Sequence, residues 1–199
     1  MKKIEYLKLI GESGKKFLEE IAILRIKVFY EFPYLYEGTL DYEKKYLETY
    51  FKAKNSIVIL VRDLNSNRIV GASTAIWAKE AEKDFSDPFV KAGMDPNEIF
   101  YFGESVLLNE YRGMGIGKAF FDMREEFARS INGIKKLAFC AVVRPTSHPH
   151  KPQDYLPLDS FWKSKGFTLV PNLKTTYEWV DRGETTKTGK VMQFWMKNI

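Results

Sequence analysis

The stretch "YRGMGIGKAF", residues 111–120, places three glycines (113, 115 and 117) between an apolar segment and a run with helical spacing. Each glycine costs a regular element about 1 kcal/mol relative to alanine, so three together indicate a feature that only glycine permits. The apolar residues 99–108 predict a strand before the glycines, and residues 117–131 predict a helix after them. This order predicts an anion site, because the first N–H groups of a helix lack partners and its dipole favours negative charge.

Two well-known phosphate-binding motifs do not fit this stretch. A P-loop requires Ser or Thr after its lysine, and here Ala119 follows Lys118. A dinucleotide fingerprint that begins at Gly113 requires a glycine where this chain has Lys118. The pattern that does fit is [RQ]-x-x-G-x-[GA], from Arg112 to Gly117.

That pattern resembles the acetyl-CoA signature of the GNAT superfamily of N-acetyltransferases. The resemblance extends over residues 4–197, because a helical amino-terminal region, an antiparallel meander, the signature, a strand and the helix "FWKSKGF" at 161–167 follow in GNAT order. It implies an α/β (α+β) fold with a mostly antiparallel central sheet flanked by helices, in one domain over residues 1–199. It also implies one parallel strand pair, residues 99–108 and 136–143, that splays apart.

The resemblance implies acetyl-CoA as a cosubstrate and assigns two sets of residues to it. The pantetheine arm would lie along the backbone of Val106, Leu107 and Leu108. The pyrophosphate would be held by Arg112, Gly113, Met114, Gly115, Ile116, Gly117 and Lys118. The physical chemistry agrees, because glycines remove side chains that would keep a phosphate from converging N–H groups. The alternative is an ordinary tight turn between a strand and a helix.

The implied reaction is acyl transfer to a primary amine by direct attack in a ternary complex. Glu104 is the candidate base, because it interrupts an apolar strand close to where the thioester would lie and could accept a proton directly or through water. The alternative is a structural carboxylate that holds a loop. In several members of the family the base lies farther ahead of the signature, where this chain has Tyr101.

The residue at the expected position of the general acid differs from that in many family members. Many members carry a tyrosine four residues before the late glycine, and this chain has Trp162, whose indole cannot protonate a thiolate as a phenol does. Tyr155 is the substitute candidate, with solvent, or a packed tyrosine without a catalytic role, as the alternatives.

Several other residues are not assigned a catalytic or metal-binding role. His148 and His150 lie in a proline-rich segment without further ligands, so no metal is expected. Cys140 lies in an apolar strand, where cysteine is usually an inert small hydrophobe. Aromatic and acidic residues between the first two helices would wall the acceptor site or simply pack: Tyr34, Tyr36, Glu37 and Asp41.

Composition narrows the class of protein. The 199 residues are 45% hydrophobic and 29% charged, as in a soluble globular protein. The apolar runs are strand-sized and the amino terminus has no apolar block with a cleavage site, so neither a membrane span nor a secretory signal is expected. One cysteine fits a reducing, cytoplasmic location. The net charge of +5 is spread among acidic residues, so no nucleic-acid partner is expected.

The expected partner is a small-molecule amine or an amino group on a larger acceptor. A non-catalytic acyl-CoA-binding module is the alternative from another class, and a basic nucleic-acid-binding protein is a third. The acceptor's identity and the oligomeric state, a homodimer included, stay open. Periodicity also predicts other elements: strands at 4–10, 56–63, 69–77, 135–143, 167–180 and 190–198, and helices at 13–32, 41–51 and 158–165, with a partly helical connection at 79–98.

Overall fold

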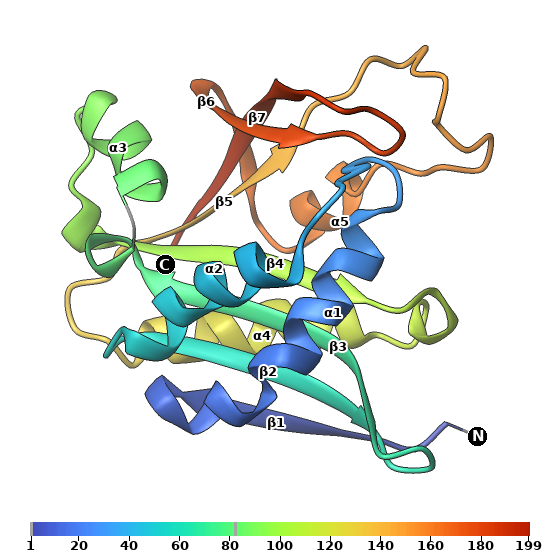
Figure 1. The fold of residues 1–199 in the computed structure, drawn as a ribbon. Coiled ribbons are helices and arrows are strands. Elements are labelled where there is room, and N and C mark those ends of the chain that lie inside the picture. Colours follow the sequence, from blue (N-terminus) through green and yellow to red (C-terminus); the bar gives the residue numbers. More distant parts are fainter. Residues whose placement is uncertain (1, 82) are drawn as a thin grey trace.

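The computed structural model describes residues 2–81 and 83–199, and in it seven strands form one sheet in the order β1-β2-β3-β4-β5-β7-β6 (Figure 1). The strands are β1 (Ile4–Ile10), β2 (Ser56–Asp63), β3 (Arg68–Trp77), β4 (Ile99–Leu107), β5 (Lys136–Val142), β6 (Thr168–Val180) and β7 (Lys187–Asn198). The helices are α1 (Leu18–Phe29), α2 (Leu40–Lys52), α3 (Lys83–Lys91), α4 (Ile116–Arg129) and α5 (Asp159–Ser164). Short 3-10 turns are η1 (Gly11–Phe17), η2 (Ala78–Glu80), η3 (Pro96–Glu98) and η4 (Asn109–Tyr111).

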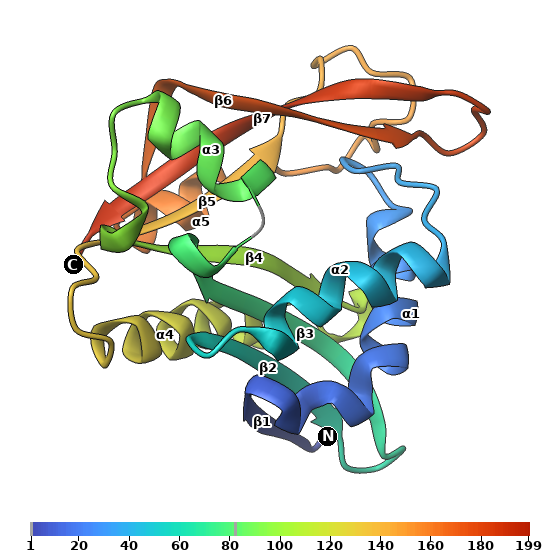
Figure 2. The same cartoon turned by 60° about the vertical axis from the view of Figure 1, so that its left-hand side comes forward.

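Helices cover both faces of this sheet. The helices α1 and α2 lie on one face and α4 lies on the other, as the two views together show (Figures 1 and 2). The apolar residues of these helices and of the central strands form one buried cluster, in which Ile21, Phe120 and Leu60 are almost inaccessible to solvent. Burial of these faces supplies most of the driving force for this arrangement.

The pair β4 and β5 is parallel, whereas the other described strand pairs are antiparallel. The register joins Ile99 to Lys136 and ends where Tyr101 faces Ala138, although β4 continues to Leu107 and β5 to Val142. The two strands therefore diverge past Tyr101, which confirms the predicted splayed pair.

A β-bulge interrupts β4 within the divergent part, just past Tyr101. The register pairs Ser73 with Ser105 and Ala75 with Phe102, so Thr74 alone faces both Gly103 and Glu104. A bulge inserts one residue and re-aims the side chains beyond it. Glycine is required at 103, because a Cβ there would lie 2.1 Å from the Tyr50 hydroxyl oxygen.

The predicted elements are found, with differences at several boundaries. The first helix begins as a 3-10 turn and the α-helix ends at Phe29, and β7 starts at Lys187 because Lys187 still pairs with Val180. In α2, the spacing of Tyr42, Tyr46 and Tyr50 at every fourth residue predicts that they share one face of the helix. That face is not the buried one at Tyr42, which is 57% exposed, whereas Glu43 is buried. Propensity and spacing alone did not show which face of α2 would meet the sheet.

No helix in the described part of the chain is long and apolar enough to cross a membrane.

Candidate active site

The glycine turn forms the start of α4, as predicted. Gly113 and Gly115 have φ angles of 76° and 78°, a left-handed conformation that costs other residues energy, and Gly115 is the residue that begins the helix. No side chain of the described residues caps this helix start. The first N–H groups of α4 are therefore open to an external acceptor.

Gly117 differs from the other two glycines. Its φ is not positive, and a Cβ there would have Phe161 as its nearest neighbour at 3.9 Å. Neither strain nor crowding within the protein explains a glycine at this position. A ligand that came close to the helix start would require a residue without a side chain here.

Two basic side chains flank the turn. Arg112 donates to the Glu31 carboxylate at 3.0 Å and to the Leu107 carbonyl at 3.4 Å, and its side chain is 51% exposed. Lys118 lies exposed in the first turn of α4. Because both side chains are exposed, each can turn toward an anion at the helix start.

The free edge of β4 presents the backbone of Leu107 but not that of Val106 or Leu108. The Leu108 N–H donates to the Val70 carbonyl at 3.0 Å, within the sheet. Because alternate residues of a strand point to the same edge, Val106 also faces β3, and Ser105 and Leu107 face the gap toward β5. The backbone groups of Val106 and Leu108 are therefore occupied within the sheet, and those of Ser105 and Leu107 are the ones that face the gap.

Glu104 lies in a buried ionic cluster on the α1–α2 face of the sheet. Its residue is 7% exposed, and its Oε2 contacts Arg25 Nη1 at 2.7 Å and accepts from the Tyr46 hydroxyl at 3.0 Å. Arg25 also forms an ion pair with Glu43, which has no exposed surface. Glu104 Oε1 has no hydrogen-bond partner among the residues that the structure describes. One buried carboxylate oxygen is thus left available to a proton or a ligand.

Phenolic hydroxyls surround this carboxylate. The Tyr46 and Tyr50 hydroxyl oxygens lie 2.8 Å apart, and burial followed by the Glu104 charge raises the pKa of both. Tyr101 lies 3.2 Å from the Cys140 sulfur, and burial followed by Cys140 raises the pKa of its hydroxyl well above the usual value. These phenols stay protonated at neutral pH, so Tyr101 is not suited to acting as the base.

Cys140 is buried beside Tyr101, and burial raises the pKa of its thiol from 9.0 to about 11. We expect iodoacetamide at pH 8 to alkylate the native thiol about a hundredfold more slowly than the urea-unfolded chain, because only the thiolate reacts. The raised pKa also means that this thiol's contribution to stability is complete below pH 9 and is lost as the pH rises through about 11. Mass spectrometry of timed samples measures the rate, and equal rates in both states would contradict the buried position.

The candidate acid Tyr155 lies partly buried in the segment between β5 and α5. Its ring meets the edge of Phe32 at a centroid distance of 4.7 Å, and burial followed by the Asp159 charge raises the pKa of its hydroxyl. Trp162 packs instead on the opposite face, with ring centroids 5.1 Å from both Phe139 and Trp195. Trp162 is therefore partly buried and packs from α5 against the core.

The segment between α1 and α2 is fastened to the β6–β7 hairpin. Arg144 donates to the carbonyls of Pro33 and Tyr34 at 2.8 and 2.6 Å and forms a two-bond ion pair with Asp181 at 2.7 and 2.8 Å. Burial opposes the charge of Asp181, but Arg144 lowers the pKa of this carboxyl overall. The segment between α1 and α2, which includes Tyr34, is thus held in place by these bonds.

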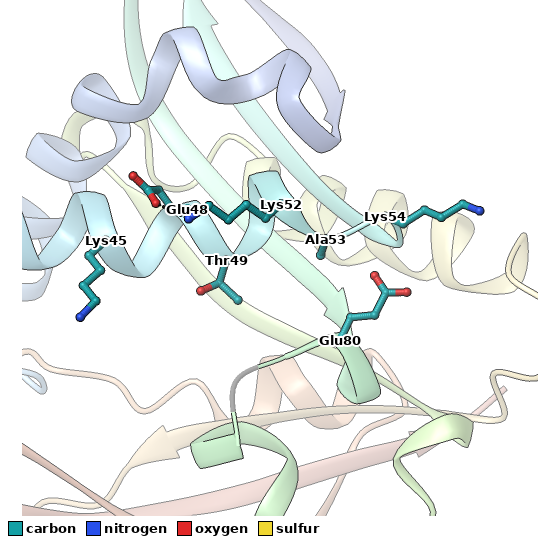
Figure 3. A pocket seen from close by; sticks show the side chains of 7 residues that line it. All are labelled: Lys45, Glu48, Thr49, Lys52, Ala53, Lys54 and Glu80. Atoms are coloured by element: carbon teal, nitrogen blue, oxygen red, sulfur yellow. Dashed lines mark hydrogen bonds and ion pairs between the residues drawn. The ribbon is translucent and has the colours of Figure 1, made fainter.

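The described residues contain no group of three or more His, Cys, Asp or Glu side chains that could hold a metal. His148 and His150 instead line a surface hollow of about 380 Å³ with Arg182 and Glu184. A larger hollow of about 560 Å³ lies between the end of α2 and η2 (Figure 3). Its lining residues are Lys45, Glu48, Thr49, Lys52, Ala53, Lys54 and Glu80, which include none of the predicted site residues.

Sequence reasoning missed several buried charged residues, and three of them lie on helices: Arg25, Glu43 and Arg124. Each lies within an apolar helical stripe, as Arg25 does four residues after Ile21 and Arg124 four residues after Phe120. A charged residue at a core position of a helix is a readable signal, because burial of a charge is costly unless it is paired. That signal identifies the residues but not their partners.

Comparison with solved structures identifies the fold. Arabidopsis thaliana NAA60 in complex with acetyl-CoA matches with a TM-score of 0.63 and 15% identity over 99% of each chain, and its complex with a bisubstrate analogue with a TM-score of 0.62. A GNAT-family acetyltransferase from Streptococcus pneumoniae matches with a TM-score of 0.55 and 16% identity over 98% of this chain and 100% of that one. No protein-family profile and no curated protein matches the sequence. The chain has the GNAT fold, which confirms the fold that the resemblance implied.

Proposed function

We propose that this chain is an acyl-CoA-dependent N-acyltransferase that transfers an acetyl group from acetyl-CoA to a primary amine. The observation that carries the proposal is the uncapped start of α4, with its three glycines, directly beside the gap between β4 and β5. The acetyl-CoA complex of the similar NAA60 structure supports the choice of donor. We further propose that residues 1–199 act as one domain and that the protein is cytoplasmic.

The residues present fit such a donor. The open N–H groups at the start of α4, with Arg112 and Lys118 beside them, suit a pyrophosphate. The gap-facing backbone of Ser105 and Leu107 suits an extended amide-containing arm, which can bond to a strand edge as another strand would. The remaining proposed contacts, through Met114 and Ile116, are to their backbone.

The proposed chemistry assigns Glu104 as the base. Acetyl-CoA supplies an activated thioester, whose C–S bond breaks as the amine nitrogen bonds to the acyl carbon, and the electron pair leaves on sulfur. Glu104 Oε1 takes the proton from the attacking nitrogen, because Arg25 and Tyr46 occupy only Oε2. Tyr155 returns a proton to the thiolate, for which its protonated hydroxyl is suited.

A non-catalytic acyl-CoA-binding protein is the rival, and Trp162 favours it, because its packed indole replaces the expected phenol. Isothermal calorimetry with acetyl-CoA, followed by release of free coenzyme A thiol with a panel of primary amines, separates the two. Binding without turnover on any amine would support the rival. Absence of binding at millimolar acetyl-CoA would remove both.

A Gly117→Ala variant is expected to move stability and coenzyme A affinity in opposite directions. The apo protein should gain about 0.5–1 kcal/mol, because alanine is the better helix former and the new Cβ has room. Coenzyme A binding should weaken, because the methyl group occupies the approach to the helix N–H groups. Melting temperatures with and without coenzyme A measure both effects, since a ligand of the native state raises Tm by mass action.

A Gly115→Asp variant is the companion to this test. It places a carboxylate at the helix start and should abolish the shift in Tm caused by coenzyme A, although its left-handed φ adds some strain of its own. Undiminished coenzyme A binding in both variants would show that the pyrophosphate lies elsewhere.

A further inference from the structure

The guanidinium of Arg124, in the middle of α4, is buried without a carboxylate. The residue is 1% exposed, and no ion pair is found for it within the described ranges, 2–81 and 83–199. Burial lowers the pKa of this group to about 9, against the opposing effect of Glu104, so it remains charged at neutral pH. It therefore differs from Arg25, which lies between two carboxylates.

The donors of Arg124 are directed at the β4 bulge. Nη1 donates to the carbonyls of Thr74 and Glu104 at 3.3 and 3.2 Å, and Nη2 donates to the Ser105 hydroxyl at 2.9 Å. The remaining donor, Nε, bonds within α4 to the Phe120 carbonyl at 3.2 Å. The rings of Phe102 and Phe121 lie 4.2 and 4.8 Å from the guanidinium carbon. These contacts hold the positive charge of the guanidinium next to backbone carbonyl groups. Because the surroundings are buried and have a low dielectric constant, the charge interacts strongly with these carbonyls.

The Glu104–Ser105 peptide unit is bonded at its carbonyl by two side chains. The Glu104 carbonyl accepts from Arg124 and also from the Ser73 hydroxyl at 2.9 Å. In a planar trans peptide the C=O and the following N–H point in opposite directions, so the Ser105 N–H points away from these donors. The strand alternation places that same N–H in the gap between β4 and β5.

We propose that Arg124 is a positioning residue that polarises the Glu104–Ser105 peptide, so that the Ser105 N–H stabilises the thioester oxygen of the acyl donor. This inference rests on the proposed acyltransferase function and deepens it. A charge placed before the reaction at the carbonyl end of the peptide strengthens its N–H end as a donor. An N–H directed at the oxygen that gains negative charge stabilises the transition state with no reorganisation.

The vibration of the bound thioester tests this directly. Acetyl-CoA carrying ¹³C at the acyl carbonyl is bound to the wild type, Arg124→Met and Arg124→Lys, and infrared difference spectra record the C=O stretch. The wild type should shift this band to lower frequency than in free acetyl-CoA. Arg124→Met, of similar length but uncharged, should lose at least half of the shift, and Arg124→Lys, which keeps the charge, should retain most of it.

Turnover and unfolding complete the test. The methionine variant should lose about 10- to 100-fold in kcat, which is less than the loss of about 10²–10³-fold when an oxyanion donor is removed, because the Ser105 N–H itself remains. The Kd of acetyl-CoA should change little. The substitution should raise the equilibrium constant of unfolding about 5- to 150-fold, which lowers the free energy of unfolding by about 1–3 kcal/mol, because methionine removes the hydrogen bonds to the buried carbonyls of Thr74 and Glu104. Arg129→Met, on the same helix but 51% exposed, is the matched control and should retain both the band and the turnover.

The outcomes separate the two proposals. An unshifted band in the wild type, or the wild-type band in Arg124→Met, overturns the role of Arg124 while acetyl-CoA still binds. Absence of acetyl-CoA binding to the wild type overturns the proposed function itself. If Arg124→Met does not fold, the wild-type band and the lysine variant still decide the inference.

Discussion

Replacement of Glu104 by glutamine is expected to lower kcat by about 10²–10⁴-fold, because the amide keeps the shape of the side chain but cannot accept the proton of the amine. The folded state should survive, since Arg25 keeps its ion pair with Glu43 when the Glu104 charge is removed. Coenzyme A affinity should change little, because Glu104 lies on the face of β4 away from the glycine turn. Steady-state turnover and calorimetry measure these two quantities.

The pH profile decides whether this loss is a loss of the base. The acidic limb of kcat/KM reports either Glu104 or the amine itself, so it must be compared among acceptors of different amine pKa. Glu98→Gln serves as the control, because that carboxylate pairs with Lys135 at the surface beside β4. A limb that follows the acceptor, together with near-normal turnover in Glu104→Gln, would show that Glu104 is structural and that water removes the proton.

Replacement of Arg25 by methionine is expected to destabilise the protein by about 3–5 kcal/mol. The change leaves two buried carboxylates, Glu43 and Glu104, without their shared cation, and the loss of one partner from a buried pair costs this much. The guanidinium also lies 4.1 Å from the centre of the Tyr46 ring, a contact that methionine does not reproduce. Urea unfolding measures the change in the free energy of unfolding.

The same measurement on a surface pair provides the comparison. Lys44→Met removes the ion pair with Glu19, which joins the same two helices. Both side chains of this pair are substantially exposed, so the free energy of unfolding should fall by about 1 kcal/mol or less. Addition of Glu43→Gln to Arg25→Met should recover part of the lost stability, because it removes one of the uncompensated charges. An Arg25→Met variant as stable as Lys44→Met would contradict the ionic cluster.

Much of the fold follows from local patterns. The strand at 99–107, the glycine turn and α4 were predictable, because periodicity, glycine and the needs of a helix start act over a few residues. The extent of β7 was less predictable, because Lys187 joins the strand only through its partner Val180. The buried face of α2 was mispredicted. Glu43 is buried because it pairs with Arg25, and Tyr42 is exposed instead.

The sequence by itself determined the glycine turn between a strand and a helix, and with it the place for an anion, because the positions of Gly113 and Gly115 need no distant partner. Only the tertiary structure decided which way the β4 side chains point. Without the bulge at Gly103, regular alternation would give Tyr101 and Glu104 opposite faces, whereas the extra residue opposite Thr74 turns Glu104 toward Arg25. That outcome depends on register and on contacts between residues about 80 positions apart, which no local pattern records.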